Sequence, residues 1–283
     1  MKKRYFIEKL GFFALRICFF IVCFILFVIM FDIISKGISK INLSFLFSSP
    51  KNGMTEGGIF PAIVGTFLVT LITAIVSVPF GIGCAIFLNE YAKNSKITRI
   101  IRIAIRNLSA VPSMVYGLFG VLLFVQLMKF GTCILASGFT LGLMTLPWVI
   151  TSSEEALKNI PQSYREGALA LGATKWQTIR TNVLPYSFSG MLTGIILGLS
   201  RAAGETAPII FTGVTFFLPF LPESVFDQFM ALPYHLYIMS TQHHSITQVR
   251  PIAYGTALVL ICLVFFMNLT AIVLRYKLRK KRK

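Results

Sequence analysis

The sequence predicts an all-helical, polytopic integral membrane protein with six transmembrane helices. Of its 283 residues, 55% are hydrophobic and only 13% are charged, whereas about 25% of the residues of a soluble domain are charged. The mean hydropathy is +0.77. Apolar runs recur along the chain, and they reach the roughly 20 residues that a helix needs to cross a bilayer. The composition therefore excludes an ordinary soluble domain.

Hydropathy places six spans along the chain, of which the first and the fifth require an argument. The first follows Met-Lys-Lys-Arg, but no Ala-x-Ala-like cleavage site follows its apolar core, so we expect an uncleaved anchor. The fifth is long enough for two crossings, yet two would separate the basic C-terminal tail from the other basic segments. We therefore expect one crossing followed by a broken or re-entrant turn. The predicted spans cover residues 11–34, 59–88, 108–128, 134–152, 187–220 and 252–274.

The distribution of lysine and arginine predicts the orientation in the membrane. The N-terminal flank, the segments 89–107 and 153–186, and the C-terminal tail together hold 21 of the 27 basic residues, whereas the intervening loops hold five. Basic residues accumulate on the cytoplasmic side of membrane proteins, which places both termini in the cytoplasm. The net charge of +17 is thereby explained by topology, and we expect no nucleic acid as a partner.

The segment 90–107 carries Arg99, Arg102 and Arg106 at spacings of three and four, with isoleucines between them. This pattern predicts a basic amphipathic helix that lies at the cytoplasmic membrane surface against lipid.

Cysteine and histidine give no sign of a metal site. The five cysteines lie in or beside apolar runs without the spacing of metal ligands, so we interpret them as small apolar fillers. His235, His243 and His244 lie in one polar stretch, where we expect them to be solvated in an external loop.

The longest cytoplasmic loop, residues 154–185, contains the spacing Glu166-x-Ala168-xxx-Gly172 followed by Leu184-Pro185. It resembles the EAA loop of ABC importer permeases, although Gly167 stands where that motif has its first alanine and Asn182 where isoleucine is usual. The resemblance implies a short helix, a turn and a second helix that rests in a groove on an ATPase subunit. Gly172 is suited to the turn because glycine readily adopts a left-handed conformation. The alternative is an amphipathic surface hairpin without a partner.

The chain contains no Gly-Lys dipeptide, so it has no GxxxxGK[ST] phosphate-binding loop. We therefore expect no catalytic residue and no cofactor on this chain, with ATP bound by a separate ATPase subunit.

The stretch SRAAGETAPII places Arg201 and Glu205 four residues apart inside an apolar run. A charge at mid-bilayer costs about 2.5–3.5 kcal/mol on insertion scales, so both side chains should face protein, water or substrate. Pro208 removes a backbone donor and crowds the carbonyl of Gly204, which predicts a kink or an end of the helix. Broken helices at membrane depth line cavities, where freed backbone groups and the Thr206 hydroxyl become possible ligands.

Two interpretations of this pair remain open from the residues alone. An arginine can hold two phosphate oxygens with parallel N–H bonds, and the glutamate would keep the anion from binding too tightly to leave. Alternatively, the two side chains form a buried ion pair that fixes helix packing without any ligand.

Three segments carry a more specific resemblance: RAAGETAPIIFT (201–212), NLSAVPSMVYGLFG (107–120) and ALPYHLYIMS (231–240). They are similar to the PstA-type permease of phosphate-specific ABC importers. The resemblance implies the type I ABC importer permease fold in a bacterial cytoplasmic (inner) membrane, with phosphate as substrate and alternating access as mechanism. It also implies a second, PstC-like permease subunit, two PstB-like ATPase subunits and an extracytoplasmic PstS-like phosphate-binding protein.

On this basis we expect three parts in the chain: an anchor helix with an external loop (1–58), the transmembrane domain (59–275) with its cytoplasmic coupling loop (153–186), and a basic tail (276–283). The rival functions are a permease for another oxyanion, such as sulfate or molybdate, and an ATP-independent channel or carrier. An intramembrane enzyme is disfavoured because the predicted spans show no nucleophile–base arrangement.

Overall fold

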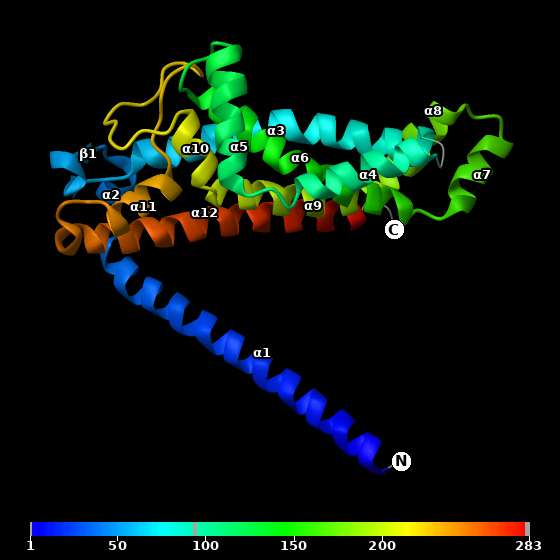
Figure 1. The fold of residues 1–283 in the computed structure, drawn as a ribbon, viewed down its shortest axis with the longest axis horizontal. Coiled ribbons are helices and arrows are strands. Elements are labelled where there is room, and N and C mark those ends of the chain that lie inside the picture. The colour runs from blue at the N-terminus through cyan, green and yellow to red at the C-terminus, as the bar shows by residue number, and fades with distance from the viewer. Residues whose placement is uncertain (1, 93–94, 281–283) are drawn as a thin grey trace.

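The computed structural model describes residues 2–92 and 95–280. Its regular secondary structure is helical apart from one short antiparallel hairpin, and its long helices, except α1, lie side by side in an elongated bundle (Figure 1). The fold therefore confirms the all-helical class. The elements are α1 (Lys2–Gly37), η1 (Ile38–Lys40), α2 (Leu43–Phe47), β1 (Pro50–Lys51), η2 (Asn52–Met54), β2 (Glu56–Gly57), α3 (Phe60–Ile86), η3 (Phe87–Tyr91), α4 (Lys96–Leu108), α5 (Ser113–Gly120), η4 (Val121–Leu127), α6 (Ile134–Lys158), α7 (Gln162–Ala170), α8 (Lys175–Thr178), η5 (Ile179–Val183), α9 (Leu184–Gly204), α10 (Ala207–Thr212), α11 (Leu232–Thr241) and α12 (Ile246–Lys280).

Five helices in the described residues are long and apolar enough to cross a membrane, and the number becomes six if a bent pair of helices is taken as one span. The bent pair joins α4 to the continuous helix formed by α5 and the π-helical η4, with an angle of 100° between them. The predicted third span, 108–128, is therefore not one straight helix along the bundle, because its first residues form the corner and α5 runs across the bundle (Figure 1). Pro112 explains the corner, since a proline disfavours the helical conformation of the residue before it.

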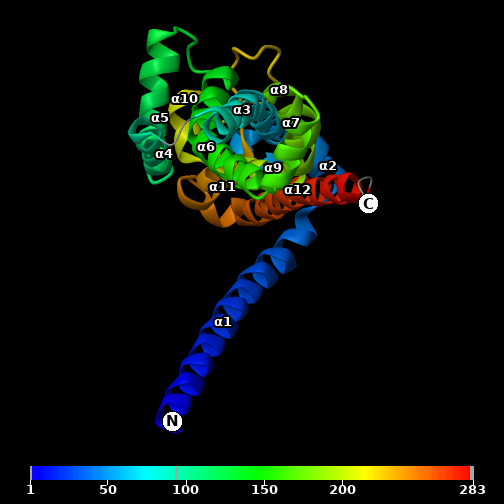
Figure 2. The ribbon, with the colours of Figure 1, turned by 90° about the vertical axis from the view of Figure 1, so that its right-hand side faces the viewer.

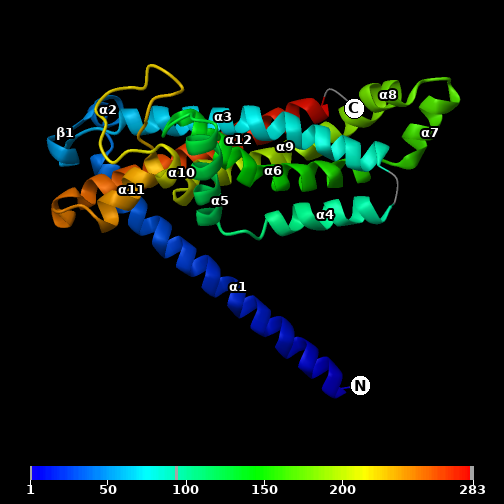
Figure 3. The same ribbon diagram turned by 45° about the horizontal axis from the view of Figure 1, so that its top comes forward.

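The helix α4 also differs from the prediction. The surface helix expected within 90–107 would lie across the bundle, but α4 runs alongside the long helices (Figures 2 and 3). It is fixed there by Arg102, whose Nε donates to Glu154 Oε1 of α6 at 2.8 Å. This ion pair joins residues 52 positions apart in the sequence, so the spacing of the arginines could not reveal it.

The two ends of the bundle are unlike. Both described ends of the chain lie toward the end that carries α7 and α8, which we call the terminal end (Figure 1). The hairpin β1–β2, α2 and α11 gather at the opposite end, which we call the hairpin end. The basic tail expected over 276–283 is a continuation of α12 as far as Lys280, and residues 281–283, like Lys93, lie outside the described residues.

The centre of the bundle is formed by α3 and α6, whose close approach depends on glycine. A Cβ added to Gly138 or Gly142 of α6 would lie 2.4 Å from Ile72 or 2.9 Å from Val76 of α3. Small residues allow transmembrane helices to pack this closely without a hydrophobic driving force between them.

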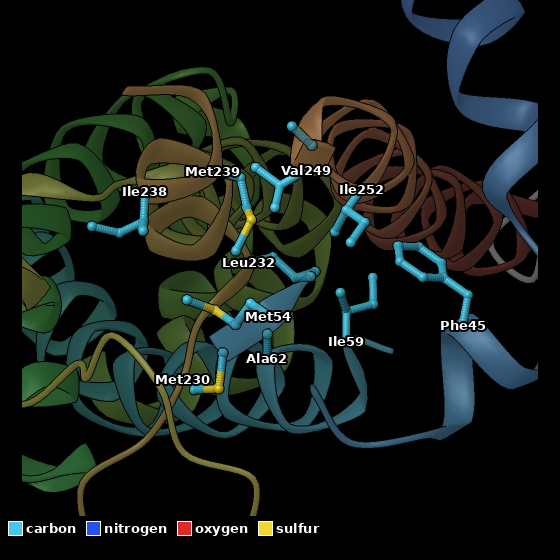
Figure 4. Packing of buried hydrophobic residues seen from close by; sticks show 11 residues of the cluster. Phe45, Met54, Ile59, Ala62, Met230, Leu232, Ile238, Met239, Val249 and Ile252 are labelled. Atoms are coloured by element: carbon cyan, nitrogen blue, oxygen red, sulfur yellow. The ribbon is translucent and has the colours of Figure 1, made fainter. Parts of the chain in front are cut away.

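An apolar cluster closes the hairpin end (Figure 4). It joins α2, the start of α3, α11 and α12 to the segment around Met230, whose carbonyl oxygen would lie 2.1 Å from a Cβ on Gly65. Its buried members are Phe45, Met54, Ile59, Ala62, Met230, Leu232, Ile238, Met239, Val249, Ile252 and Ala253.

Two histidines are buried at this end, so the expectation that all three are solvated is wrong. The His243 ring lies 2.9 Å from the Gly53 carbonyl oxygen, because the loop folds back onto the hairpin. His235 Nδ1 lies 3.2 Å from the Thr256 hydroxyl. That hydroxyl donates to the Ile252 carbonyl oxygen at 2.9 Å, so it accepts from His235. Burial, with the nearby His243 as a smaller cause, lowers the pKa of His235 to about 4.

The helix α1 leaves the bundle at an angle (Figure 1). None of its most apolar stretch is buried. Its last turns are tied to α12, where the Tyr254 hydroxyl donates to Asp32 Oδ2 at 3.0 Å and Lys36 pairs with the same carboxylate.

Candidate functional site

The predicted break in the fifth span is present. The helix α9 ends at Gly204, Glu205 is extended with ψ of 133°, and α10 starts at Ala207. Pro208 stands in the first turn of α10, where its missing N–H costs nothing. Gly204 itself is helical, and a Cβ built on it would meet nothing within 4 Å. The proline therefore accounts for the break.

Arg201 and Glu205 form the predicted ion pair, with Arg201 Nε donating to Glu205 Oε1 at 3.2 Å. The arginine side chain is 61% exposed and the glutamate 19%. Beside them, Gly204 is exposed and Thr206 is half-buried, whereas Pro208 is buried. The pair is therefore not sealed between the helices of this chain, and one side of it is open to a ligand or to another subunit.

A small cavity of about 20 Å³ lies beside Arg201, enough for about one water molecule. It is bordered by Tyr116 of α5 and Trp148 of α6, neither of which the sequence singled out. The Tyr116 hydroxyl donates to the Leu108 carbonyl oxygen at 2.9 Å and so ties the α4–α5 corner next to the pair. Gly198 is the residue in the sequence that could have indicated this close packing, since a Cβ there would lie 3.0 Å from Trp148.

Both halves of the broken helix contact α6, but each also rests on an element that the other half does not share. The first half, α9, packs against α6 and α12, and Ser200 donates to Asn268 of α12 at 2.8 Å. The second half, α10, packs against α5, where Gly117 allows the backbone of Pro208 to approach. At the end of α10, the carbonyl oxygen of Thr212 accepts a hydrogen bond of 3.0 Å from the backbone N–H of Cys133, which caps α6. A relative movement of these elements would therefore be felt at the ion pair.

The loop at the terminal end has the expected helix–turn–helix form. The helix α7 ends before Gly172, which has φ of +83°, and α8 starts with a capping box formed by Thr174 and Gln177. These features confirm the turn predicted at Gly172.

The six predicted coupling residues do not form one surface. Three are exposed on the loop, one is buried against it, and two are half-buried within the start of α9. In that order they are Glu166, Gly167 and Gly172; Ala168; and Leu184 and Pro185.

The tip of the loop presents apolar side chains that the sequence analysis missed. Leu171 is 90% exposed, Trp176 51% and Leu169 48%. Large apolar residues in a basic, polar loop were the available signal. Exposed aromatic and leucine side chains on a protruding element are typical of a docking surface.

A second missed residue, Arg165, joins this loop to the bundle. Its Nη2 donates to Glu90 Oε1 of η3 at 2.8 Å and to the Leu157 carbonyl oxygen at 3.0 Å, and its Nη1 donates to the Ile160 carbonyl oxygen at 2.8 Å. The Arg165 and Glu90 side chains are only 13% and 7% exposed. One guanidinium thus binds α7 to the ends of α3 and α6. Glu90 lies 75 residues away in the sequence, so no local spacing indicates this contact.

Comparison with known proteins assigns the family. The family described as "Binding-protein-dependent transport system inner membrane component" matches residues 77–283. The probable ABC transporter permease protein YqgI of Bacillus subtilis (strain 168) is 32% identical over 275 residues, which cover 93% of each chain. The phosphate transport system permease protein PstA 1 of Mycobacterium tuberculosis (strain ATCC 25618 / H37Rv) is 32% identical over 230 residues, 80% of this chain and 72% of that one.

The fold is also found in a solved structure. A bacterial ABC transporter involved in the import of the acidic polysaccharide alginate superimposes with a TM-score of 0.65 at 14% identity, covering 93% of this chain and 96% of that chain. At this identity the likeness concerns the fold alone. The chain belongs to the family of binding-protein-dependent transport system inner membrane components.

Proposed function

We propose that this chain is one permease subunit of an ATP-driven importer of inorganic phosphate in a bacterial inner membrane. The family and the name of the relative from Mycobacterium tuberculosis support the class of transporter and of substrate. The observation that carries the proposal is the Arg201–Glu205 pair, which stands open at a break in a membrane-spanning helix. A charged pair at such a break is expensive unless it serves a passing ion.

Arg201 contacts the phosphate ion, since its guanidinium can offer two parallel N–H donors to two phosphate oxygens. Glu205 balances the arginine when no anion is bound and shortens the residence time of the anion. Thr206 and the backbone freed beside Pro208 supply further polar contacts, and Gly204 leaves room for the ion to approach. Binding here is weak, because an extracytoplasmic phosphate-binding protein captures the substrate first.

Energy enters through the loop at the terminal end. The exposed residues Leu171 and Trp176, together with the carboxylate of Glu166, dock into a groove on a separate ATPase subunit. The ATPase hydrolyses ATP, and this chain catalyses no reaction. Closure of two ATPase subunits moves the loops of this permease and of a second, similar permease, so that the pathway alternates between outward-facing and inward-facing forms.

The same assignment orients the molecule. Both termini and the α7–α8 loop lie in the cytoplasm, and the hairpin end faces the phosphate-binding protein. The common position of the termini and the loop at one end of the bundle supports this orientation.

The test is phosphate uptake by the assembled transporter in proteoliposomes. Labelled phosphate and the binding protein are added outside the vesicles, and ATP is enclosed in the lumen. Uptake is expected to require ATP and to persist in excess sulfate or molybdate. Arg201→Ala is expected to abolish it, whereas Arg275→Ala on α12 serves as a matched loss of one exposed arginine. Uptake that sulfate or molybdate competes away would assign another oxyanion. Uptake that continues without ATP would refute the importer.

A further inference from the structure

The helix α4 carries a row of cations along one face. Lys96, Arg99, Arg102 and Arg106 border a cleft of about 670 Å³ that Lys158 of α6 also lines. Their spacings of three and four residues place them one above another on the helix.

One carboxylate, that of Glu154, forms salt bridges beside this row, and both of its partners are identified. Glu154 accepts from Arg102 Nε at 2.8 Å and from Lys158 Nζ at 2.8 Å. The Arg102 Nη2 also donates to the Leu88 carbonyl oxygen at 2.8 Å, so Arg102 holds α4 against the bundle. Within the described residues, no salt bridge reaches Lys96, Arg99 or Arg106.

The position of α4 connects this row to the ion pair. The helix runs along the bundle axis (Figures 2 and 3), and it ends at Leu108, which borders the cavity beside Arg201. With a rise of 1.5 Å per residue, the ten steps from Lys96 to Arg106 span about 15 Å. That is roughly half the 30 Å hydrocarbon thickness of a bilayer. The row therefore extends about 15 Å from the neighbourhood of Arg201 toward the terminal end.

We propose that Lys96, Arg99 and Arg106 form a second oxyanion site, which receives the phosphate ion after Arg201 and leads it to the cytoplasm. This inference rests on the proposed function. Exposed cations attract an anion without binding it tightly, and several weak sites in series let an ion enter and leave. A cleft lined by one sign of charge also raises the local concentration of its counter-ion. We call this site the α4 cation row.

The competing source of phosphate groups is the lipid headgroup. The structure favours the free ion, because α4 runs along the bundle and not across it in the plane of a membrane surface. The row also opens on a cleft that is shared with Lys158 of α6.

The experiment compares Arg99→Gln/Arg106→Gln with wild type in the assembled transporter, in proteoliposomes of a neutral galactolipid that contains no phosphate and of the same lipid mixed with anionic phosphatidylglycerol. Uptake per transporter is expected to fall about tenfold in both lipids, the lower end of what charge focusing supplies. Arg99→Lys/Arg106→Lys is expected to restore most of it, because the charge is retained. Arg275→Gln/Lys277→Gln, which removes two exposed cations from α12, is expected to transport like wild type.

The outcomes separate this inference from the proposed function. Wild-type rates in Arg99→Gln/Arg106→Gln would refute the α4 cation row alone. A defect confined to the anionic lipid mixture would assign the row to lipid headgroups and also refute it. Failure of the wild-type transporter to take up phosphate would overturn both proposals. If the double variant does not assemble with the ATPase, the single variants Arg99→Gln and Arg106→Gln decide, and unchanged uptake in both refutes the row.

Discussion

Replacing Arg165 with alanine is expected to free α7 from the bundle while the bundle remains folded. The change removes the charged hydrogen bonds to Glu90 and the two bonds to the carbonyl oxygens of Leu157 and Ile160. Breaking a buried ion pair by removing one partner costs about 3–5 kcal/mol. Because the Arg165 side chain is 13% exposed and water reaches part of it, we expect about 3 kcal/mol, the lower end of that range.

Hydrogen exchange of the α7 amides measures this free energy directly. A loss of about 3 kcal/mol corresponds to roughly a hundredfold faster exchange in α7, since a helix of nine residues is not stable once it is undocked. Exchange in α3 and α6 should change little. In the assembled transporter, ATP hydrolysis should continue while phosphate uptake falls, because the loop no longer moves the bundle.

Matched variants make the result decisive. Arg180→Ala removes an exposed arginine from the same loop and should leave α7 exchange unchanged. A double-mutant cycle with Glu90→Gln should give a coupling energy above about 1 kcal/mol. Unchanged α7 exchange in Arg165→Ala, or a coupling energy near zero, would refute the argument that this guanidinium joins the loop to the bundle.

Three further predictions concern glycine and histidine. Gly65→Ala should lower stability by about 1–3 kcal/mol through overpacking against the Met230 carbonyl, whereas Gly83→Ala on the same helix meets nothing within 4 Å and should preserve the melting temperature. Gly167→Ala, also in open space, should stabilise α7 by about 0.5–1 kcal/mol, and faster α7 hydrogen exchange would contradict this. Because His235 has a pKa of about 4, below its ordinary value, the unfolded chain binds the extra proton. Stability should therefore be full above about pH 6.5 and fall by about 1.4 kcal/mol per pH unit toward pH 4. In His235→Asn, the melting temperature should depend less on pH across this range than it does in the wild type.

The sequence predicted those features that depend on neighbouring residues. Proline four residues after Gly204 predicted the break, and the i,i+4 spacing predicted the pair that Arg201 and Glu205 form. The left-handed turn at Gly172 followed from its place in the loop. Each of these rests on backbone geometry within about one helical turn, which a single sequence contains.

The features that the sequence did not predict depend on contacts between distant segments. The orientation of α4 follows from Arg102 and Glu154, and the attachment of α7 follows from Arg165 and Glu90. A pattern of arginines and isoleucines is equally compatible with a lipid surface and with a cleft, so amphipathicity alone could not distinguish them. His235 was misassigned for the same reason, since its partner Thr256 is provided by α12.

The exposure of α1 outside the bundle has a consequence for the protein in a membrane. Its apolar stretch is unburied, and its last turns, near Asp32 and Lys36, join it to the bundle. The family match begins at residue 77, well past this helix. In a membrane, the apolar stretch of α1 is long enough to cross the hydrocarbon core and is left for lipid to cover.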